Sequence, residues 1–277
     1  FYLSIRYSLE NWLCSRWIEE YGPEQAEAMC TAINEEAPGA IRVNTTLTTR
    51  EALLAQVEKL DLTAEADPLV PEAITLIKCP APVRNKIFQE GHFYIQDTAS
   101  MLPPHLLEPE PGERILDMCA SPGGKTTHIA QLTQNKAMII SNDLGGRNYW
   151  RTQENIERLQ LENIRLTISD ANALPFKGPF DRVLLDAPCP GMGTFRRHPD
   201  LKYRMGPKAP RRLGKKQLAL LRSAIEVCKN GGVIVYSVCT FSAEETEDLA
   251  KIITGEAAVV LEDGPDWLDA WKISKGQ

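Results

Sequence analysis

Strands and helices are expected to alternate from Glu113 to Ile253, and this alternation constrains the fold more than any other feature of the chain. Short β-branched runs are separated by longer segments in which apolar residues recur at helical spacing. Such alternation favours a parallel sheet with right-handed crossovers, so we predict an α/β fold. The predicted strands are 114–119, 137–143, 164–170, 181–187 and 232–238, with one further possible strand at 257–263. The predicted helices are 124–132, 147–159, 213–228 and 244–253.

The first 92 residues show a different pattern, which predicts a smaller α+β domain. Thr48 or Thr49 is expected to cap a helix there, because a hydroxyl oxygen can accept a hydrogen bond from a first-turn N–H group. Helices are expected at 1–36 and 48–60 and strands at 41–46 and 73–78, followed by a Pro-rich segment at 79–85 and a linking strand and helix at 93–107. We place the domain boundary between residues 92 and 93, so that residues 93–277 form the larger domain.

Composition excludes several classes of protein. The 277 residues are 43% hydrophobic and 25% charged, as in an ordinary globular protein, and no apolar run is long enough to predict a membrane span. The seven cysteines contain no CxxC pair and the four histidines are dispersed, so we expect reduced thiols in the cytoplasm and neither disulfides nor a metal site. The start at Phe1, without a signal-peptide pattern, indicates a trimmed or partial sequence.

Positive charge is concentrated in one segment of an otherwise acidic chain. Between Arg196 and Lys216 there are nine Lys or Arg residues and one acid, Asp200, so this segment carries +8 while the rest of the chain carries −14. Charge runs of this kind are often solvated surface loops. This one comes just after a predicted strand end, where a polyanionic substrate would have to bind, and we favour contact with nucleic acid.

A glycine-containing loop, CASPGGKT at residues 119–126, follows the first predicted strand of the larger domain. A phosphate-binding P-loop would need glycine at Cys119, and a dinucleotide loop would need a third glycine, so both patterns fail. A methyltransferase-type loop remains, in which glycines let the backbone approach a small cofactor and the helix N-terminus offers N–H groups to a carboxylate. A tight turn that simply needs glycine is the alternative.

Three acidic residues end successive predicted strands. Asp143 follows the glycines by about 20 residues, where a carboxylate can accept both ribose hydroxyls of a nucleoside. Asp170 is placed to accept a hydrogen bond from an adenine amino group, and Asp186 ends the fourth strand. Each of them can instead cap the turn that follows its strand. Three in succession at one sheet edge favour a nucleoside site.

Two cysteines follow neighbouring predicted strands, Cys189 in DAPCPG and Cys239 in YSVCTF. Each side chain is expected at the carboxyl edge of the sheet, where ligands bind in open α/β folds. Cysteine is also a common small buried residue, which is our interpretation for Cys14, Cys30, Cys79, Cys228 and the side chain of Cys119. The residues alone do not tell Cys189 from Cys239, and the Pro-Cys context used by DNA cytosine methyltransferases would favour Cys189.

Six segments that together span nearly the whole chain form one specific combination: YSLENWLCSRW (7–17), RVNT (42–45), FQEGHFYIQDTAS (88–100), DMCASPGGKT (117–126), FDRVLLDAPCPGMG (180–193) and YSVCTFSAEETE (236–247). In these the chain resembles the RNA cytosine-5 methyltransferases of the bacterial Sun type and their eukaryotic NSUN relatives, in particular the bacterial 16S rRNA enzymes. Four positions depart from the pattern. Pro190 stands for the usual Ser, Val238 for Thr, Thr246 for Asn and Glu10 for a common Pro, so no reactive group is lost.

This resemblance implies a Rossmann-like sheet that uses S-adenosylmethionine, an N-terminal domain that binds RNA, and a 5-methylcytosine product. Cys239 would attack C6 of cytosine, Cys189 would assist release, Asp186 would hydrogen-bond the base, and Lys125 would pair with a strand-end carboxylate and tune a thiol. The implied cofactor residues are Cys119, Ala120, Ser121, Pro122, Gly123, Gly124, Lys125, Asp143, Arg147, Asp170 and Asp186. The implied RNA contacts are Arg196, Arg197, Lys202 and Arg204, which would hold the phosphates beside a base displaced from its stack.

Other functions stay open at this point. An amino-group methyltransferase would carry an aromatic residue after the Asn/Asp-Pro-Pro of the fourth strand, which DAPCPG lacks. A non-catalytic RNA-binding or ribosome-assembly factor with a retained cofactor fold would not need Cys189, Cys239 and Asp186 together. The resemblance favours ribosomal RNA as the substrate, with tRNA as the alternative.

Overall fold

The computed structural model describes residues 1–59, 63–78, 83, 85–257 and 259–265. The chain folds into two compact units, each built from separate stretches of sequence. We call Pro38–Ala187 with Ala219–Ser237 the sheet unit. We call Phe1–Ala37, Pro188–Leu218 and Val238–Gln277 the cysteine unit. The domain boundary predicted between residues 92 and 93 stays a prediction.

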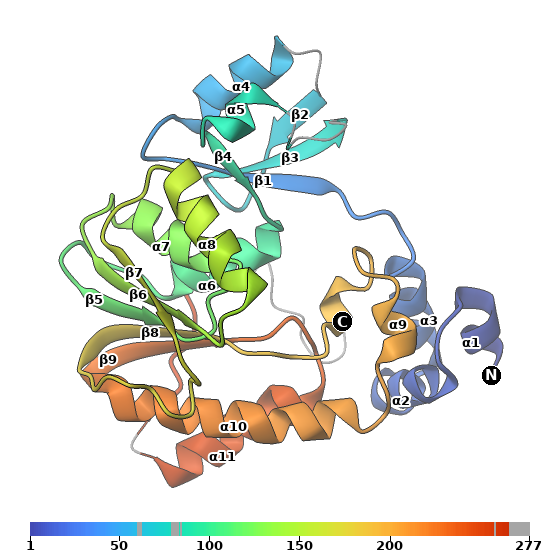
Figure 1. Ribbon diagram of the computed structural model, residues 1–277. Helices are drawn as coiled ribbons and strands as arrows, with labels where there is room; N and C mark the ends of the chain where they lie inside the picture. Colours follow the sequence, from blue (N-terminus) through green and yellow to red (C-terminus); the bar gives the residue numbers. More distant parts are fainter. Residues whose placement is uncertain (60–62, 79–82, 84, 258, 266–277) are drawn as a thin grey trace. The chain divides into compact units, whose positions relative to one another are not determined.

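The sheet unit contains the predicted parallel sheet, whose strands have the order β7-β6-β5-β8-β9 (Figure 1). Every neighbouring pair is parallel, which confirms the predicted α/β, Rossmann-like fold. Ile115, Ile139 and Leu184 are fully buried in its core. The strands are β5 (Arg114–Asp117), β6 (Met138–Asp143), β7 (Ile164–Ile168), β8 (Phe180–Asp186) and β9 (Cys228–Ser237).

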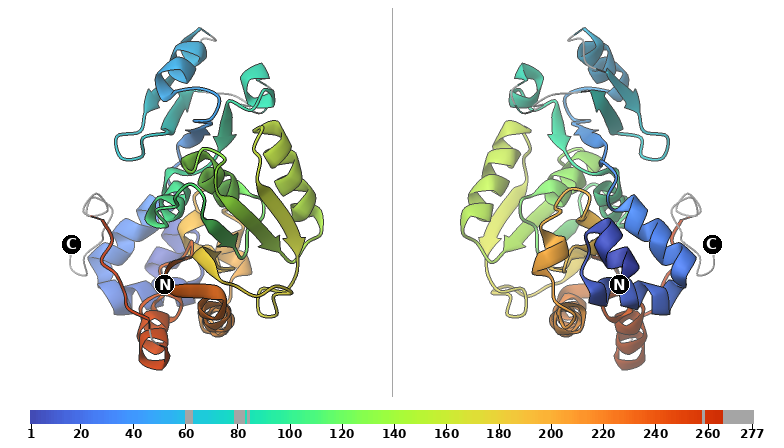
Figure 2. Two further views of the ribbon diagram at one scale, coloured as in Figure 1. Left: turned by 90° about the vertical axis from the view of Figure 1, so that its left-hand side faces the viewer. Right: turned by 90° about the vertical axis from the view of Figure 1, so that its right-hand side faces the viewer.

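Crossover helices pack against this sheet, as Figures 1 and 2 show. Helix α6 packs on β8 and β9, α7 on β6, and α8 on β7. The order of the strands reverses at β5, since β6 lies on one side of β5 and β8 on the other. Ligands bind at such a switch point, outside the carboxyl ends of the strands. The helices are α6 (Thr98–Leu106), α7 (Gly124–Leu132), α8 (Arg147–Arg158) and α10 (Ala209–Val227).

The sheet unit also contains a small antiparallel sheet, with strand order β2-β3-β1-β4, covered by α4 and α5. Thr49 caps α4, where its hydroxyl accepts a hydrogen bond from the Ala52 N–H group. The sequence patterns missed β2 because its residues, TAEA, are largely exposed and have low strand propensity. The elements are β1 (Gly39–Val43), α4 (Arg50–Glu58), β2 (Thr63–Ala66), β3 (Ala73–Lys78), α5 (Lys86–Gln89) and β4 (Phe93–Ile95).

A fully buried arginine joins the small sheet to α7. Arg42, on β1, donates hydrogen bonds to the side chains of Gln131, Gln96 and Thr127 and to the backbone oxygen of Gly124. Buried charges are tolerated in proteins only when hydrogen bonds satisfy them, and this guanidinium reaches four oxygen acceptors. These charge-assisted hydrogen bonds from Arg42 therefore fix the first turn of α7 against β1.

The cysteine unit packs N-terminal helices against the segment that follows β8. Leu13 and Trp17 of α2 share a buried core with Met192 and Phe195. The elements are α1 (Tyr2–Tyr7), α2 (Asn11–Tyr21), α3 (Pro23–Ala32), the 3-10 helices η2 (Met192–Thr194) and η3 (Ala243–Glu245), α9 (Leu201–Arg204), the first half of α10, and α11 (Glu247–Glu256).

One expectation about the C-terminal part is wrong. The possible strand at 257–263 is absent from those of its residues that the structure describes, and residue 258 lies outside them. The predicted helix at 244–253 is confirmed as α11, which begins three residues later, after the 3-10 helix η3. Among the described helices, none is long and apolar enough to cross a membrane.

Candidate functional site

The loop between β5 and α7 is held in place by backbone hydrogen bonds. The Ser121 N–H group donates to Asp143 Oδ2 over 3.0 Å, and the Gly123 N–H group donates to the Ala120 oxygen over 2.7 Å. Gly123 has φ +90°, a left-handed conformation that favours glycine, and a Cβ atom there would lie 2.8 Å from Thr152 Cγ2. Glycine is therefore required at this position by backbone conformation as well as by space.

The three predicted strand-end acids lie at the carboxyl ends of β6, β7 and β8, but they have different partners. Asp143 accepts the Ser121 hydrogen bond. Asp170 caps its own turn by accepting from the backbone and side chain of Asn172, and these bonds lower its pKa. Asp186 pairs through Oδ2 with Lys125 Nζ at 2.5 Å and accepts the Ser237 hydroxyl at 2.7 Å. The loop and these acids thus belong to one edge of the sheet.

A fourth strand-end acid, Asp117, was missed by the sequence interpretation although it ends β5 just as the others end β6, β7 and β8. It is fully buried and accepts the Thr126 hydroxyl at 2.6 Å, while its Oδ1 has no hydrogen-bond partner among the described residues. Burial raises its pKa to about 7. Burial, followed by the charges of Asp117, Asp143 and other strand-end acids, raises the pKa of Cys119 to about 12.

The raised pKa of Asp117 predicts a fall in stability with rising pH. Its carboxyl group binds a proton more tightly in the folded protein than in the unfolded chain, so the stabilisation is complete below about pH 4 and is lost as the pH rises towards 7. The expected slope is up to about 1.4 kcal/mol per pH unit. Urea unfolding across this range measures it, and Asp117→Asn should flatten that component; an unchanged slope in the variant would contradict the assignment.

The two candidate thiols lie in direct contact in the cysteine unit. The Sγ atoms of Cys189 and Cys239 are 2.9 Å apart, and the Cys239 N–H group points to the Cys189 sulfur at 3.2 Å. Both are free cysteines; Cys239 is exposed and Cys189 is half-buried. The Gly193 N–H group donates to the Cys239 backbone oxygen, which fixes the second loop against the first.

The environment of the pair is asymmetric. The hydrogen bond between the Cys189 and Cys239 thiols, followed by burial, raises the pKa of the Cys189 thiol above its usual range. Because Cys189 keeps its proton, it can donate to a thiolate on Cys239, and the thiolate is the nucleophilic form of cysteine.

Three polar side chains that the sequence interpretation missed support both cysteine loops. Gln217, on α10, donates to the Pro188 backbone oxygen at 3.0 Å and to Glu245 Oε1 at 2.8 Å. Glu245 is fully buried and also accepts the Ser242 hydroxyl at 2.6 Å. No local sequence signal marks Glu245 as buried, because neighbouring residues such as Glu244 and Glu247 are acidic and its partner Gln217 lies 28 residues earlier in the chain.

The four predicted RNA contacts have different environments. Arg196 is exposed and donates to the backbone oxygens of residues 35 and 36, and Arg204 pairs with Asp200 at 3.0 Å on the surface. Arg197 is exposed. Lys202 is only 5% exposed and donates to Asn34 Oδ1 at 2.7 Å, so its ammonium group serves the interior of the cysteine unit.

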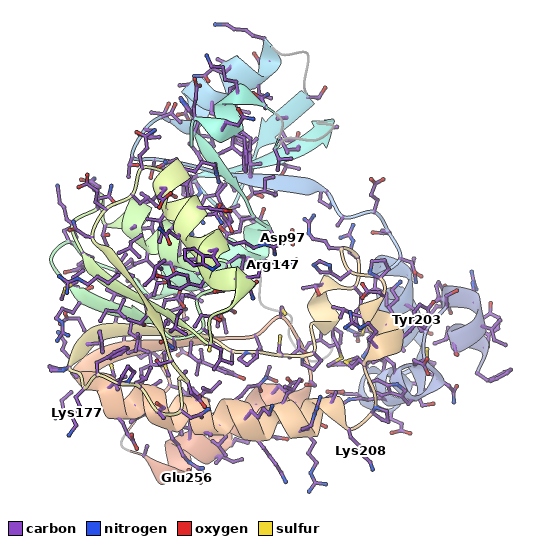
Figure 3. All side chains as sticks on the ribbon, in the orientation of Figure 1. Asp97, Arg147, Lys177, Tyr203, Lys208 and Glu256 are labelled. Atoms are coloured by element: carbon purple, nitrogen blue, oxygen red, sulfur yellow. The ribbon has the colours of Figure 1, made fainter. Side chains whose placement is uncertain are left out.

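The predicted cofactor residues lie together in the sheet unit. Residues 119–125 form the loop and the start of α7, and Lys125 extends to Asp186. Arg147 is the first residue of α8 and is exposed; Figure 3 labels it at that end of the helix. It lies four residues after Asp143, on the chain that leaves β6. Ala120 is buried and Pro122 is exposed, which places the backbone between them at the surface of the loop.

Models of known protein families match both the N-terminal and the C-terminal parts of the chain. The model of the 16S rRNA methyltransferase RsmB/F family matches residues 104–269, and the ferredoxin-like domain model of RsmF/B-like methyltransferases matches residues 9–84. The chain belongs to the RsmB/F family. The resemblance stated from the sequence motifs is thereby confirmed at the level of the family.

One relative is the probable ribosomal RNA small subunit methyltransferase B of Bacillus subtilis. It is 37% identical over 250 residues, which cover 89% of this chain and 56% of that protein. The protein of the same description from Synechocystis is 33% identical over 285 residues, covering 99% and 62%. The chain thus spans about three fifths of the length of these relatives. The structure of NSun6 from Pyrococcus horikoshii with SFG has a TM-score of 0.84 and 27% identity, covering 89% of this chain and 87% of that one.

Proposed function

We propose that the chain is an S-adenosylmethionine-dependent RNA methyltransferase that forms 5-methylcytosine in ribosomal RNA, through a covalent bond from Cys239 to C6 of the base. The contact between an exposed Cys239 and a Cys189 that keeps its proton carries this proposal. Membership of the RsmB/F family supports the substrate class. Only two residues, Ala187 and Pro188, separate Asp186 at the carboxyl end of β8 from Cys189 in the chain.

The sheet unit suits a cationic cofactor. The charges of four strand-end carboxylates, Asp117, Asp143, Asp170 and Asp186, all act on Cys119 in the loop, so the potential there is negative. S-adenosylmethionine carries a positive sulfonium and an ammonium group, which such a potential attracts. Asp143 and the loop 119–125 would hold the nucleoside and amino-acid parts, and Arg147 and Asp170 would border them. The related NSun6 structure with SFG, an analogue of this cofactor, supports the proposal.

The chain's own residues would carry the remaining chemistry. The Cys239 thiolate adds to C6 of cytosine, which makes C5 nucleophilic enough to accept the methyl group that the bound cofactor supplies. Asp186, held by Lys125 and Ser237, would hydrogen-bond N3 and the exocyclic amine and so favour the attack. Loss of the C5 proton then breaks the bond between C6 and Cys239. Cys189 would assist this step, either as the base or in the elimination.

Exposed basic side chains would hold the RNA. We leave Lys202 out of this surface because its ammonium group is buried, and we add the start of α10, where Figure 3 labels Lys208 just before the helix. Clustered positive charges bind phosphates and release counterions. The proposed set is Arg196, Arg197, Arg204, Lys208, Arg211, Arg212, Lys215 and Lys216, all exposed. Residues 1–92 would extend the RNA-binding surface, as the resemblance implies.

Neutralising the start of α10 should weaken RNA binding in a salt-dependent way. The test variant carries Gln at Arg211, Arg212, Lys215 and Lys216. Binding should become less salt-dependent: the negative slope of log K against log salt should shrink in magnitude by about 0.7 per lost phosphate contact, up to about 3 in total. Filter binding at several salt concentrations measures this slope. Gln at Lys136, Lys177 and Lys229, all in the sheet unit, is the matched control. Equal slopes for the two variants would contradict the proposed surface.

Methyl transfer from labelled cofactor tests the proposed function directly. The purified chain is incubated with 16S rRNA or tRNA, the RNA is digested, and the labelled nucleoside is identified. Label in 5-methylcytidine from rRNA supports the proposal, and label from tRNA alone would replace the substrate. Label on the exocyclic amine would contradict the mechanism. Cofactor binding without transfer to either RNA would favour a non-catalytic RNA-binding factor.

A further inference from the structure

A second cluster of ligand-type side chains lies in the sheet unit, apart from the strand-end acids. Glu72 precedes β3, His105 lies on α6 and His128 on α7. The Nε2 atoms of both histidines approach the same carboxylate oxygen, Glu72 Oε1, at 2.7 Å from His105 and 2.5 Å from His128. One ligand atom from each residue lies within 4.8 Å of the other two. Three segments that are distant in sequence thus bring two imidazoles and one carboxylate together.

His128 is not satisfied by hydrogen bonds in this cluster. Its side chain is 1% exposed, yet neither ring nitrogen has a hydrogen-bond partner among the described residues. Its Nε2 atom lies 2.5 Å from Glu72 Oε1, the same oxygen that His105 Nε2 approaches, so two imidazoles converge on one carboxylate oxygen. Buried polar atoms without a partner are rare in folded proteins, and each requires an explanation. A buried imidazole nitrogen aimed at a carboxylate oxygen and a second imidazole is a metal-ligand arrangement.

We propose that Glu72, His105 and His128 bind a zinc ion. Two imidazole nitrogens and one carboxylate oxygen are ligands that zinc accepts, with a water molecule in the fourth position. His105 is 22% exposed and provides access for the ion and this water, whereas Glu72 and His128 are buried. Tetrahedral coordination at about 2.0–2.1 Å separates ligand atoms by about 3.3 Å, so these atoms must move apart by about 0.6–0.8 Å. Rotation of the partly exposed His105 side chain can supply part of that movement.

The nearby arginine does not compete for the carboxylate. Arg42 directs its donors to Gln131, Gln96, Thr127 and the Gly124 oxygen, and none of these bonds reaches Glu72. The carboxylate oxygen Oε1 is therefore left to the imidazoles. A bound ion would join the start of β3 to α6 and to α7, whose first turn begins four residues before His128. Such a site would hold α7 in place from its core side.

Metal binding by the whole purified chain tests the proposal. After metal removal and addition of zinc sulfate, elemental analysis of the dialysed protein should find one zinc per chain, and cobalt chloride should give the visible absorption bands of tetrahedral Co²⁺. His105→Leu and Glu72→Gln should each weaken zinc binding by more than the roughly 10- to 100-fold that loss of an outer-shell partner costs, because each removes a direct ligand. His198→Asn, which removes an exposed histidine of the cysteine unit, is the control and should bind as the parent does. Zinc binding that is absent, or that only His198→Asn weakens, would overturn the proposal.

Thermal unfolding gives a second measurement that does not depend on activity. Zinc should raise the melting temperature of the parent and of His198→Asn by several degrees, because it binds the folded state. The same zinc should leave His105→Leu unchanged. His105 is partly exposed, so this variant should fold, and circular dichroism checks that it does. An equal rise in all three proteins would show surface binding and overturn the site.

Discussion

Replacing Cys239 with alanine should abolish the covalent adduct with RNA that contains 5-fluorocytosine. The fluorine atom at C5 blocks the loss that normally frees the enzyme, so a thiol that attacks C6 stays bound to the base. Turnover on ordinary RNA should fall by on the order of 10⁴-fold or more, because the nucleophile is removed. Denaturing electrophoresis of labelled RNA measures the adduct, and a steady-state methyl-transfer assay measures turnover.

Cys189→Ala is the informative partner of this variant. It should keep the adduct with 5-fluorocytosine RNA and should also accumulate adduct with unmodified RNA, because release is slowed while attack remains. Cys228→Ala removes a half-buried thiol at the start of β9 and is the matched control, expected to behave as the parent. An adduct that survives Cys239→Ala and disappears in Cys189→Ala would reverse the two roles.

Asp186→Asn should lower the rate of methyl transfer by about 10²- to 10³-fold, the range for loss of a positioned charge at the reacting atoms. The change removes the 2.5 Å ion pair with Lys125 and weakens the Ser237 hydrogen bond. Cofactor affinity should change much less, because Asp143 and the loop 119–125 would carry most of that binding in the proposed site. Single-turnover kinetics with saturating cofactor separates the two quantities.

A matched control for this ion pair exists at the other end of the same strands. Asp181 and Lys229 also lie 2.5 Å apart, near the amino ends of β8 and β9. Asp181→Asn should therefore leave the rate within about twofold of the parent, since solvent-exposed pairs contribute little and this one is far from the carboxyl edge. A comparable loss in both variants would mean that Asp186 acts through general stability, and the proposed contact with the base would fail.

The fold of the sheet unit was predictable from the sequence because its signals are local. β-branched runs, a glycine at a left-handed turn and strand-end acids each act within a few residues. The start of β9 was not predictable, because Lys229–Asn230–Gly231–Gly232 has low strand propensity. Only the pairing with β8 extends the strand across these residues. Helix α10 likewise begins at Ala209, before the predicted Leu213, because Pro210 is tolerated in a first turn.

The candidate site was predictable in part, for the same physical reason. The loop, Asp143 and the two cysteines were found because each stands at a strand end. Tertiary packing alone brings Gln217 to Glu245 and Glu72 to His128. No spacing in the sequence predicts either pair. The four histidines are dispersed along the sequence, so their spacing predicted no metal site. Two of them, His105 on α6 and His128 on α7, nevertheless lie in contact in the folded chain.

Each unit is built from separate stretches of sequence, so the order of synthesis affects when its core can form. Helices α1–α3 are synthesised well before their core partners Met192 and Phe195 and the loop of Cys239. Until then the core around Leu13 and Trp17 is covered only by other residues of the N-terminal segment, and exposed apolar surface of this kind promotes aggregation during folding. The reactive thiol pair is also assembled only when residue 239 has been made, so a truncated product cannot contain it.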